Sequence, residues 1–484
     1  MKKLFLISLA VSSILFAGAQ NINKNGGLSK DQIKALQSSY KSTGADKALR
    51  NAVVTNDINK LAKNYDNNTA FDAHFSNQVP SKAITDQESS GRCWMFAGMN
   101  VLRAKAIKKY DLPSDFQFSQ CYTFFWDQLE KSNLFLQAIL DNRAKSMEDE
   151  TVKWLFQNPL SDGGQFTGVS NLVTKYGLVP SDAMPESFCA NSTSQMSSQL
   201  KNLLREDGLK LRKAWEQKAA AAGKLKGKKA EAATAAAEKE LEAMKVDMPK
   251  EVYRILVLCL GVPPTEFEWA RYDSKGQFVS CRKYTPKSFY QEFVGADLEN
   301  NYVMLMNDPS REFGKGYEID YDRHVYDGQN WLYVNLPIER IKEIAIASIK
   351  DNTAMYFSCD VGKFLNRQSG VLDMKNFDYE SLMGVKFTMD KKERIQTHAS
   401  GSSHAMTLIA VDIKDGNPVK WMVENSWGAA TGYKGNMIMT DEWFNEYMFR
   451  LVVEKKYVPQ DIMKMLEQKP ILLPAWDPMF LGEE

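Results

Sequence analysis

The hydrophobic pattern changes character along the chain, and this change limits the folds that are open to it. From about residue 84 to 180 the apolar residues recur at helical spacing, whereas from about residue 250 onward aromatic and β-branched segments predominate. The pattern predicts a helix-rich part followed by a strand-rich part. No repeat with a period of roughly 20–50 residues is apparent, so a solenoid or a propeller is not expected.

The composition is that of an ordinary globular protein and excludes several classes. With 484 residues, 44% of them hydrophobic, the chain can bury a sizeable core, either as about three domain-sized units or as one large domain with insertions. Its 61 Lys and Arg residues against 60 Asp and Glu residues leave a net charge of +1. This balance gives no reason to expect nucleic acid or an anionic membrane as the main partner.

The cysteines and histidines do not form a metal-binding pattern. The six cysteines include no Cys-x-x-Cys pair, and the chain has only four histidines. We therefore expect no metal site and no cofactor. A chain with a large core does not need disulfides, so we predict buried thiols rather than a disulfide framework.

The first residues have the pattern of a secretory signal. Lys2 and Lys3 precede an apolar stretch over residues 4–15, and Ala17 and Ala19 then stand two positions apart, as small residues do before a signal peptidase site. A membrane anchor is the alternative, but the apolar run is shorter than the ~20 residues that span a bilayer. We predict a signal peptide over residues 1–19, cleavage near Ala19, and an exported protein, periplasmic or secreted, without a membrane association.

Changes in composition divide the rest of the chain into segments. Residues 29–32 form a capping-box pattern that opens a helical stretch running toward Lys41. A Lys-, Ala- and Glu-rich region containing Gly223 and Gly227 predicts a solvated helical hairpin. The predicted segments are an N-terminal arm over 20–80, a helical lobe over 81–195, an inserted helical hairpin over 196–250, a β-rich lobe over 251–468 and a C-terminal arm over 469–484.

The segment over residues 87–98 predicts a reactive cysteine. Apolar residues that follow Cys93 recur at spacings of three and four, so a buried helix begins here, with Ser89 or Ser90 as its candidate cap. Cys93 then lies in the first helical turn, where unsatisfied amides and the helix dipole favour a thiolate over a thiol. Cys93 could instead be a small buried hydrophobic residue, but the glycine-led start of the helix and the neighbouring Trp94 favour the reactive interpretation.

A second group of polar residues lies around two predicted strands. Residues 404–413 are apolar enough for a strand buried on both faces, and a turn over 414–418 leads into a second strand through 421–424. We expect this hairpin to bring Asn425 back near His404.

Three motifs follow one another in the chain: the nucleophile segment over 87–97, Ser-His-Ala-Met over 403–406, and Glu-Asn-Ser-Trp-Gly over 424–428. In sequence and order they resemble the motifs of the papain-like cysteine peptidases, specifically the bleomycin hydrolase and aminopeptidase C branch. Further matches lie at 162–165, 359–365, 440–444 and 473–479, so the resemblance covers essentially the whole mature chain. It implies an α+β, two-lobed papain-like fold, in which a helical lobe faces an antiparallel, barrel-like β lobe, with the inserted hairpin and the C-terminal arm added.

The resemblance also implies roles in thiol-dependent hydrolysis of peptides. Cys93 is the thiolate that attacks the carbonyl, and His404 protonates the leaving amine. Asn425 orients the imidazole by a hydrogen bond, and Trp427 shields that bond from water. Gln87 donates to the oxyanion together with the backbone amide of Cys93.

Each of these assignments has an alternative. His398 is a second candidate for the acid, but it lies in a flexible polar segment that would position an acid poorly. Asn425 could be a plain turn residue, and Gln87 a loop amide. Gly163 and Gly164 could form an ordinary turn, whereas the resemblance makes them the backbone edge that pairs with extended substrate.

The C-terminal arm is the segment to which the family resemblance assigns the substrate specificity. Prolines at 470, 474 and 478 exclude a helix there, so we predict an extended arm docked in a groove. By resemblance the arm lies in the active-site cleft, where the carboxylate of Glu484 faces the free amine of a peptide. The alternative is a tail that only packs on a neighbour.

The number of residues between the cysteine and histidine motifs also favours the bleomycin hydrolase and aminopeptidase C branch. The interval from Cys93 to His404 exceeds the ~130 to 150 residues of simple papain-like enzymes, which fits the inserted hairpin and the strand-rich middle. The branch implies an aminopeptidase and a homohexamer.

Two other functions stay open on the sequence alone. An exported endopeptidase would have its C-terminal arm displaced or trimmed. A catalytically idle member of the fold would act as a binding protein, and such a protein could touch nucleic acid. The intact set of Cys93, His404, Asn425 and Gln87 and the near-neutral charge argue against the idle form.

Overall fold

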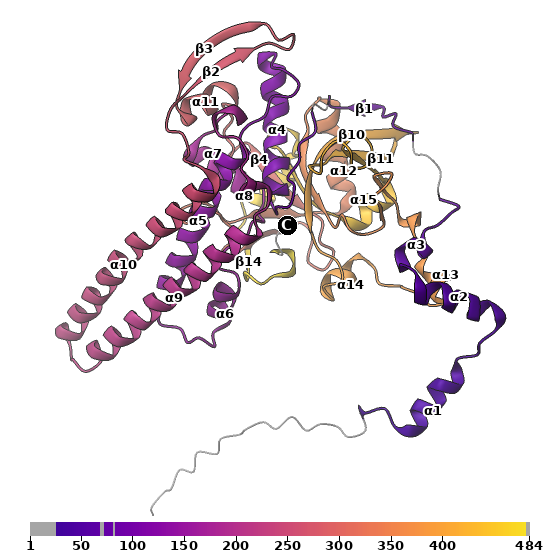
Figure 1. The fold of residues 1–484 in the computed structure, drawn as a ribbon, viewed down its shortest axis with the longest axis horizontal. Helices are drawn as coiled ribbons and strands as arrows, with labels where there is room; N and C mark the ends of the chain where they lie inside the picture. Colours follow the sequence, from indigo (N-terminus) through magenta and orange to yellow (C-terminus); the bar gives the residue numbers. More distant parts are fainter. Residues whose placement is uncertain (1–25, 68–71, 81–82, 481–484) are drawn as a thin grey trace, which may run out of the picture. The chain divides into compact units, whose positions relative to one another are not determined.

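A computed structural model describes residues 26–67, 72–80 and 83–480 (Figure 1). The predicted signal peptide over 1–19 and the predicted substrate-binding residue Glu484 lie outside the described residues. The chain divides into two compact units, Met1–Lys63 and Asn64–Glu484.

The described part of the first unit consists of three helices. Helix α1 (Lys30–Ser39) begins after Ser29, whose hydroxyl accepts a hydrogen bond from the Gln32 amide at 3.2 Å, while the Gln32 side chain accepts one from the Ser29 amide at 2.8 Å. The predicted capping box is thus confirmed. Helices α2 (Gly44–Thr55) and α3 (Ile58–Ala62) follow.

In the second unit, the helices that follow the nucleophile loop surround a common apolar core. They are α4 (Cys93–Tyr110), α5 (Gln120–Asp141), α6 (Glu150–Gln157), α7 (Phe166–Tyr176) and α8 (Phe188–Asn191). Helix α4 is buried on nearly every side because it packs between α7 and the central strands β7 and β10 of the sheet described below. This sandwiched position explains why its sequence has little amphipathic character.

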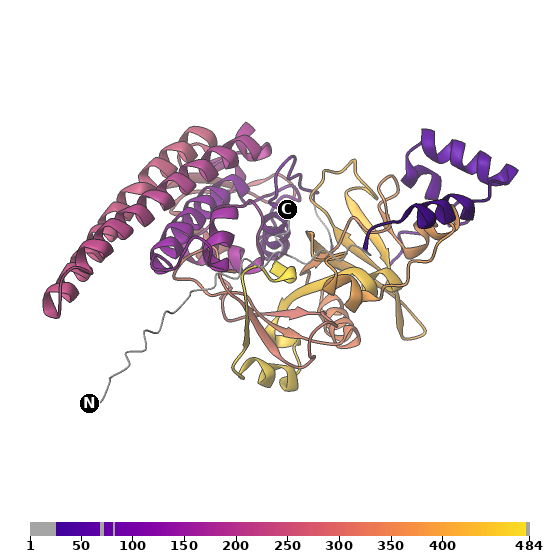
Figure 2. The ribbon, with the colours of Figure 1, turned by 90° about the horizontal axis from the view of Figure 1, so that it is seen from below.

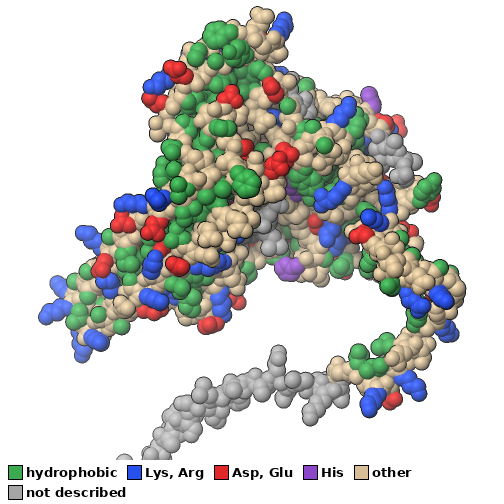
Figure 3. All heavy atoms as spheres, viewed as in Figure 1, with side chains coloured by type: hydrophobic (Ala, Val, Ile, Leu, Met, Phe, Trp, Pro, Cys, Tyr) green, Lys and Arg blue, Asp and Glu red, His purple; other side chains and the backbone are tan. Residues whose placement is uncertain are grey.

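Two long helices form a hairpin that extends away from the rest of this unit (Figure 1). They are α9 (Ser194–Ala222) and α10 (Lys228–Leu260), joined by a turn in which Gly227 adopts a φ of +56°. Lys and Arg side chains alternate with Asp and Glu side chains along the hairpin (Figure 3), as in the Lys218–Glu240 pair at 2.5 Å. Helix α10 continues past the predicted boundary at 250, since its last turns bury apolar residues against α5.

Most strands of the described residues form one mixed sheet. Its strand order is β14-β5-β6-β4-β13-β7-β10-β11-β12-β9-β8, and β1 pairs with β10. The strands are β1 (Asn77–Gln78), β4 (Tyr302–Met306), β5 (Gly316–Ile319), β6 (Leu332–Asn335), β7 (Met355–Cys359), β8 (Leu365–Asn366), β9 (Val371–Leu372), β10 (His404–Lys414), β11 (Asn417–Glu424), β12 (Asn436–Thr440), β13 (Met448–Glu454) and β14 (Ile471–Leu473).

The pairing of these strands agrees with the expected antiparallel lobe at its centre and adds parallel pairs around it. The run from β4 through β13, β7, β10 and β11 to β12 is antiparallel. The pairs β4–β6, β12–β9 and β14–β5 are parallel. The hairpin predicted over 404–424 is confirmed as β10–β11.

The remaining elements are a small second sheet and several helices. A separate two-stranded sheet consists of β2 (Phe267–Tyr272) and β3 (Phe278–Tyr284). The remaining helices are α11 (Pro286–Phe293), α12 (Ile338–Lys350), α13 (Tyr379–Met383), α14 (Lys391–Gln396), α15 (Asp441–Tyr447) and α16 (Gln460–Leu466). Figure 2 shows the helices of residues 93–260 on one side of this unit and the strands of the sheet on the other.

None of the six cysteines forms a disulfide in the structure. Cys93, Cys121 and Cys359 are buried, as predicted, while Cys189 and Cys259 are half-buried. The prediction of a buried thiol is wrong for Cys281, because it lies on β3 of the small two-stranded sheet, which is mostly exposed. Within the described ranges, no helix combines the length and the apolar character that crossing a membrane requires.

Candidate active site

The nucleophile loop leads directly into α4. The helix begins at Cys93, and its N-cap residue Arg92 makes no side-chain capping hydrogen bond. The predicted cap by Ser89 or Ser90 is wrong, because the Ser90 hydroxyl donates to the Gln87 carbonyl oxygen at 2.6 Å and accepts from Nε of Arg92 at 2.9 Å. The positive end of the helix dipole therefore meets the Cys93 side chain without a competing side-chain cap.

Cys93 lies against the start of β10. Its side chain is fully buried, and the backbone amide of Ala405 donates to Cys93 Sγ at 3.5 Å. Ala405 directly follows His404, the first residue of β10, which pairs with Cys359 of β7. The fold thus brings the cysteine of the helical layer and the strand that begins with the histidine to one place.

His404 is oriented by the strand that follows it in the hairpin. Its Nε2 and the Oδ1 of Asn425 are 2.7 Å apart, and both side chains are buried. The ring of Trp427 lies over the imidazole, with the ring centroids 4.7 Å apart. An amide oxygen can only accept a hydrogen bond, so Nε2 carries a proton and Nδ1 is the ring nitrogen left for proton transfer.

Gln87 is fixed between the nucleophile loop and the segment after Asn425. Its Oε1 accepts from the Ser426 hydroxyl at 2.7 Å, and its backbone amide donates to the Ser426 carbonyl oxygen at 2.9 Å. Its Nε2 donates to the Ser90 carbonyl oxygen at 2.7 Å. A primary amide has two hydrogens, so one donor of Nε2 remains for a ligand.

Gly163 and Gly164 lie in a loop that packs on the nucleophile helix. The indole nitrogen of Trp94 donates to the Asp162 carbonyl oxygen at 2.8 Å, and Lys131 Nζ donates to the Gly163 carbonyl oxygen at 2.6 Å. A Cβ added at Gly164 would come within 2.8 Å of the Trp94 ring and closer still to the ring of His324. Glycine is therefore required at 164 by close packing, a reason that the sequence pattern does not reveal.

A buried cluster behind this loop was not predicted from the sequence. His324 Nδ1 lies 2.5 Å from Oδ1 of Asp127, and Lys131 Nζ lies 3.0 Å from Oδ2 of the same carboxylate. Burial acts to raise the pKa of Asp127, but Lys131 and His324 outweigh it and hold that pKa below its usual value. Burial, with Lys131, lowers the pKa of His324. The cluster therefore holds an ionised Asp127 and a neutral His324 that donates through Nδ1.

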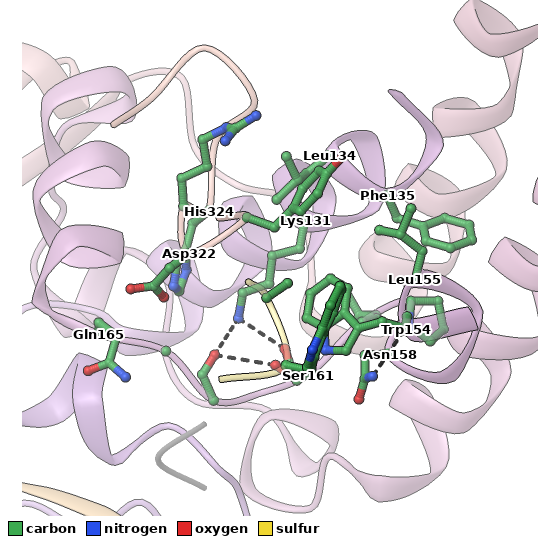
Figure 4. A pocket seen from close by; sticks show the side chains of 18 of the residues that line it. Lys131, Leu134, Phe135, Trp154, Leu155, Asn158, Ser161, Gln165, Asp322 and His324 are labelled. Atoms are coloured by element: carbon green, nitrogen blue, oxygen red, sulfur yellow. Dashed lines mark hydrogen bonds between the residues drawn. The ribbon is translucent and has the colours of Figure 1, made fainter. Parts of the chain in front are cut away.

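A pocket of about 320 Å³ opens beside the glycine loop (Figure 4). Apolar side chains of α5 and α6, including Leu134, Phe135 and Trp154, form one wall, and Lys131 and His324 reach into it from the cluster just described. Residues 475–477 of the C-terminal arm complete the lining. The loop that carries Gly163 and Gly164 thus forms an edge of a largely apolar cavity.

The described part of the C-terminal arm packs against the rest of this unit. Strand β14 adds to the sheet in parallel beside β5, and Met479 is fully buried. Arg311 pairs with Asp477, and Arg450 donates to the Met479 carbonyl oxygen. The described arm thus extends as far as residue 480 beside the pocket, while Glu484 lies beyond the described residues.

His398, the competing histidine, is exposed and follows α14, away from the hydrogen bond that orients His404.

A buried ion pair that the sequence did not reveal supports the strand leading to Asn425. Arg103 Nη2 lies 2.8 Å from Oε1 of Glu424, and Arg103 Nη1 donates to the Ala83 carbonyl oxygen at 2.8 Å. The sequence offers one signal for this pair, an arginine that directly follows the apolar residues Val101 and Leu102 of α4.

The chain is similar over nearly its whole length to known peptidases. The model of the Peptidase C1-like family matches residues 27–480. Bleomycin hydrolase of Homo sapiens is 38% identical over 467 residues, which cover 94% of this chain and 98% of the relative. Aminopeptidase C of Lactococcus lactis subsp. cremoris is 36% identical over 438 residues, which cover 90% of this chain and 94% of the relative.

A solved structure has the same fold. PepW from Lactobacillus rhamnosis HN001 matches with a TM-score of 0.86 and 34% identity, over 94% of this chain and 99% of that chain. The predicted fold class is thereby confirmed. The chain belongs to the Peptidase C1-like family and is a papain-like cysteine peptidase of the bleomycin hydrolase and aminopeptidase C branch.

Proposed function

We propose that this peptidase is a thiol-dependent aminopeptidase that removes N-terminal residues from peptides. The observation that carries the proposal is the junction of α4 and β10, where the amide that follows His404 contacts the Cys93 sulfur at 3.5 Å and Asn425 holds the His404 ring at 2.7 Å. Such a junction supplies a nucleophile, an acid and an orienting group from three separate segments of the chain.

The proposed reaction begins with proton transfer from the Cys93 thiol to His404. The thiolate attacks the peptide carbonyl carbon, and the imidazolium then gives its proton to the leaving amine, which leaves a thioester on Cys93. The neutral imidazole next takes a proton from water, whose oxygen attacks the thioester and releases the acid and the thiol. Asn425 keeps the ring in the orientation that both transfers need, and Trp427 excludes water from their hydrogen bond.

Gln87 is proposed to stabilise the oxyanion with the backbone amide of Cys93. Replacing Gln87 by alanine removes the remaining Nε2 donor, so we expect kcat to fall by about 10²–10³-fold with little change in KM. Steady-state kinetics on a peptide substrate measure both constants. The matched control is Ser426→Ala, which removes the 2.7 Å bond that anchors Gln87 but leaves the donor in place. A fall in kcat as large for Ser426→Ala as for Gln87→Ala would contradict a direct role for the amide.

The aminopeptidase specificity is proposed to come from the C-terminal arm. The arm is held beside the pocket by the pairing of β14 with β5 and by the Arg311–Asp477 ion pair. A terminal carboxylate at Glu484 beyond this anchored segment would meet the ammonium group of a bound peptide and limit how much substrate precedes the cleaved bond. The names of the relatives that are aminopeptidases support the same specificity.

Peptides with free and with acetylated N-termini test this proposal. We expect the full chain to cleave the free peptide at least about 10-fold faster, because the acetyl group removes the charge that the carboxylate attracts. A variant that ends at residue 480 keeps the docked arm and should cleave both peptides at similar rates. The control Glu483→Gln/Glu484→Gln keeps the terminal carboxylate and should keep the preference. Equal cleavage of both peptides by the full chain would indicate an endopeptidase.

We also propose that the protein is exported after cleavage near Ala19 and that it assembles as a homohexamer. The basic and apolar pattern of residues 2–19 supports export. The resemblance to the bleomycin hydrolase branch supports the assembly. A mature N-terminus at Gln20, found by mass spectrometry of protein recovered outside the cytoplasm, and the mass of the assembly from light scattering are the corresponding measurements.

A further inference from the structure

Two cysteines meet at the base of the helical hairpin. Cys189 lies on α8, and Cys259 lies in the last turn of α10. Ser187 joins the two segments, since its hydroxyl donates to the Cys259 carbonyl oxygen at 2.9 Å and accepts from the amide of Ala190 at 3.0 Å. Helices α8 and α10 pack against each other here, and burial together with the neighbouring Cys189 thiol raises the pKa of Cys259 to about 11.

The surroundings leave this pair accessible and separate it from a third thiol. Cys189 and Cys259 are both half-buried, so a small oxidant can reach them. Cys121 is fully buried on α5, and its sulfur donates to the Leu260 carbonyl oxygen at 3.5 Å. Because Cys121 is fully buried, a small oxidant does not reach its thiol, and it is a poor competitor.

We propose that Cys189 and Cys259 are a redox-active dithiol that forms a disulfide across the base of the hairpin when the protein meets a small disulfide such as glutathione disulfide. The Cys189 thiolate attacks one sulfur of the oxidant and releases one glutathione thiolate. The Cys259 thiolate then attacks the Cys189 sulfur of this mixed disulfide and releases the second. The two cysteines lose two protons and two electrons, and one glutathione disulfide becomes two glutathiones.

The disulfide would link the hairpin to the segment over residues 186–191, which contacts the nucleophile loop. In the segment that carries Cys189, Glu186 pairs with the buried Arg92 at 2.8 Å, and the Asn191 carbonyl oxygen accepts from the Ser89 amide at 2.9 Å. Between the two cysteines lies the whole hairpin, so the bond closes a long loop and restricts the unfolded chain strongly. Oxidation should therefore stabilise the region behind the nucleophile without a new contact in the active site.

The experiment uses the full chain with Cys93→Ala, so that the catalytic thiol does not react with the oxidant. The protein is incubated with glutathione disulfide, the remaining thiols are alkylated, and a non-reducing digest is analysed by mass spectrometry. We expect a cross-linked peptide that joins Cys189 to Cys259. The apparent unfolding temperature should rise by roughly 2–5 °C and return to its original value after reduction.

Three variants in the same background serve as controls. Cys189→Ser and Cys259→Ser should each lose both the cross-linked peptide and the rise in unfolding temperature. Cys281→Ser, which removes the exposed thiol of β3, should keep both. The proposal is overturned if oxidised protein shows Cys189 and Cys259 separately alkylated or separately joined to glutathione, or if either cysteine is joined to Cys121 instead.

Discussion

Replacing Cys93 by alanine is expected to lower kcat/KM for peptide hydrolysis by at least about 10⁴-fold, because no other group at this position can form the thioester. The thiol is fully buried at the first turn of α4, and alanine fills most of its space. The fold should therefore persist, with an unchanged circular dichroism spectrum. The measurement is the rate of release of an N-terminal residue under reducing conditions.

The matched control is Cys281→Ala. Cys281 is an exposed thiol on β3, far in the chain from the catalytic motifs, so its loss should leave turnover within about twofold of the wild type. A thiol-alkylating reagent should inactivate the wild type and Cys281→Ala at the same rate. Turnover by Cys93→Ala close to that of the wild type would remove the basis of the proposed mechanism.

Local elements were predictable because their signals are local. The helix that starts at Cys93, the strand that starts at His404 and the capping box at Ser29 each depend on a short stretch whose periodicity or cap is visible in the sequence. The meeting of the first two was expected only from the resemblance to a family. In the structure it depends on the packing of α4 against β10, which no pattern within either element encodes.

The cluster behind Gly164 shows what the sequence could not reveal. Asp127 and Lys131 lie in α5, one helical turn apart, and such a pair is usually a solvated ion pair on a helix surface. Here the pair is buried, because His324 from a distant loop packs on Asp127 and on Trp94. The role of a charged residue thus depends on which segment covers it, and that is a tertiary property.

The start of α4 differs from the expected capped helix because of a tertiary requirement. Serine before an apolar run is a common helix cap, which is why the sequence predicts Ser89 or Ser90 in this role. In the structure the Ser90 hydroxyl bonds to Gln87 and Arg92 instead. Because the Ser90 hydroxyl stabilises the loop that holds Gln87, it is not available to cap α4, and the local capping preference is overridden at the candidate site.

The second large effect is expected at the ion pair beneath Asn425. Arg103 and Glu424 are both nearly fully buried, and Arg103→Met removes the guanidinium that pairs with the Glu424 carboxylate. An uncompensated buried charge costs several kcal/mol, so we expect the free energy of unfolding to fall by about 3–5 kcal/mol. Urea denaturation followed by tryptophan fluorescence measures this change.

The double variant Arg103→Met/Glu424→Gln separates the cost of the stranded charge from the loss of the pair. A neutral amide in place of the carboxylate removes the uncompensated charge, so the double variant should regain more than half of the lost stability. The exposed Lys250–Asp247 pair on α10 is the matched comparison, and Lys250→Ala should leave stability unchanged within error because solvent screens that pair. A double variant no more stable than Arg103→Met would mean that lost packing of the arginine, rather than the buried carboxylate, sets the cost.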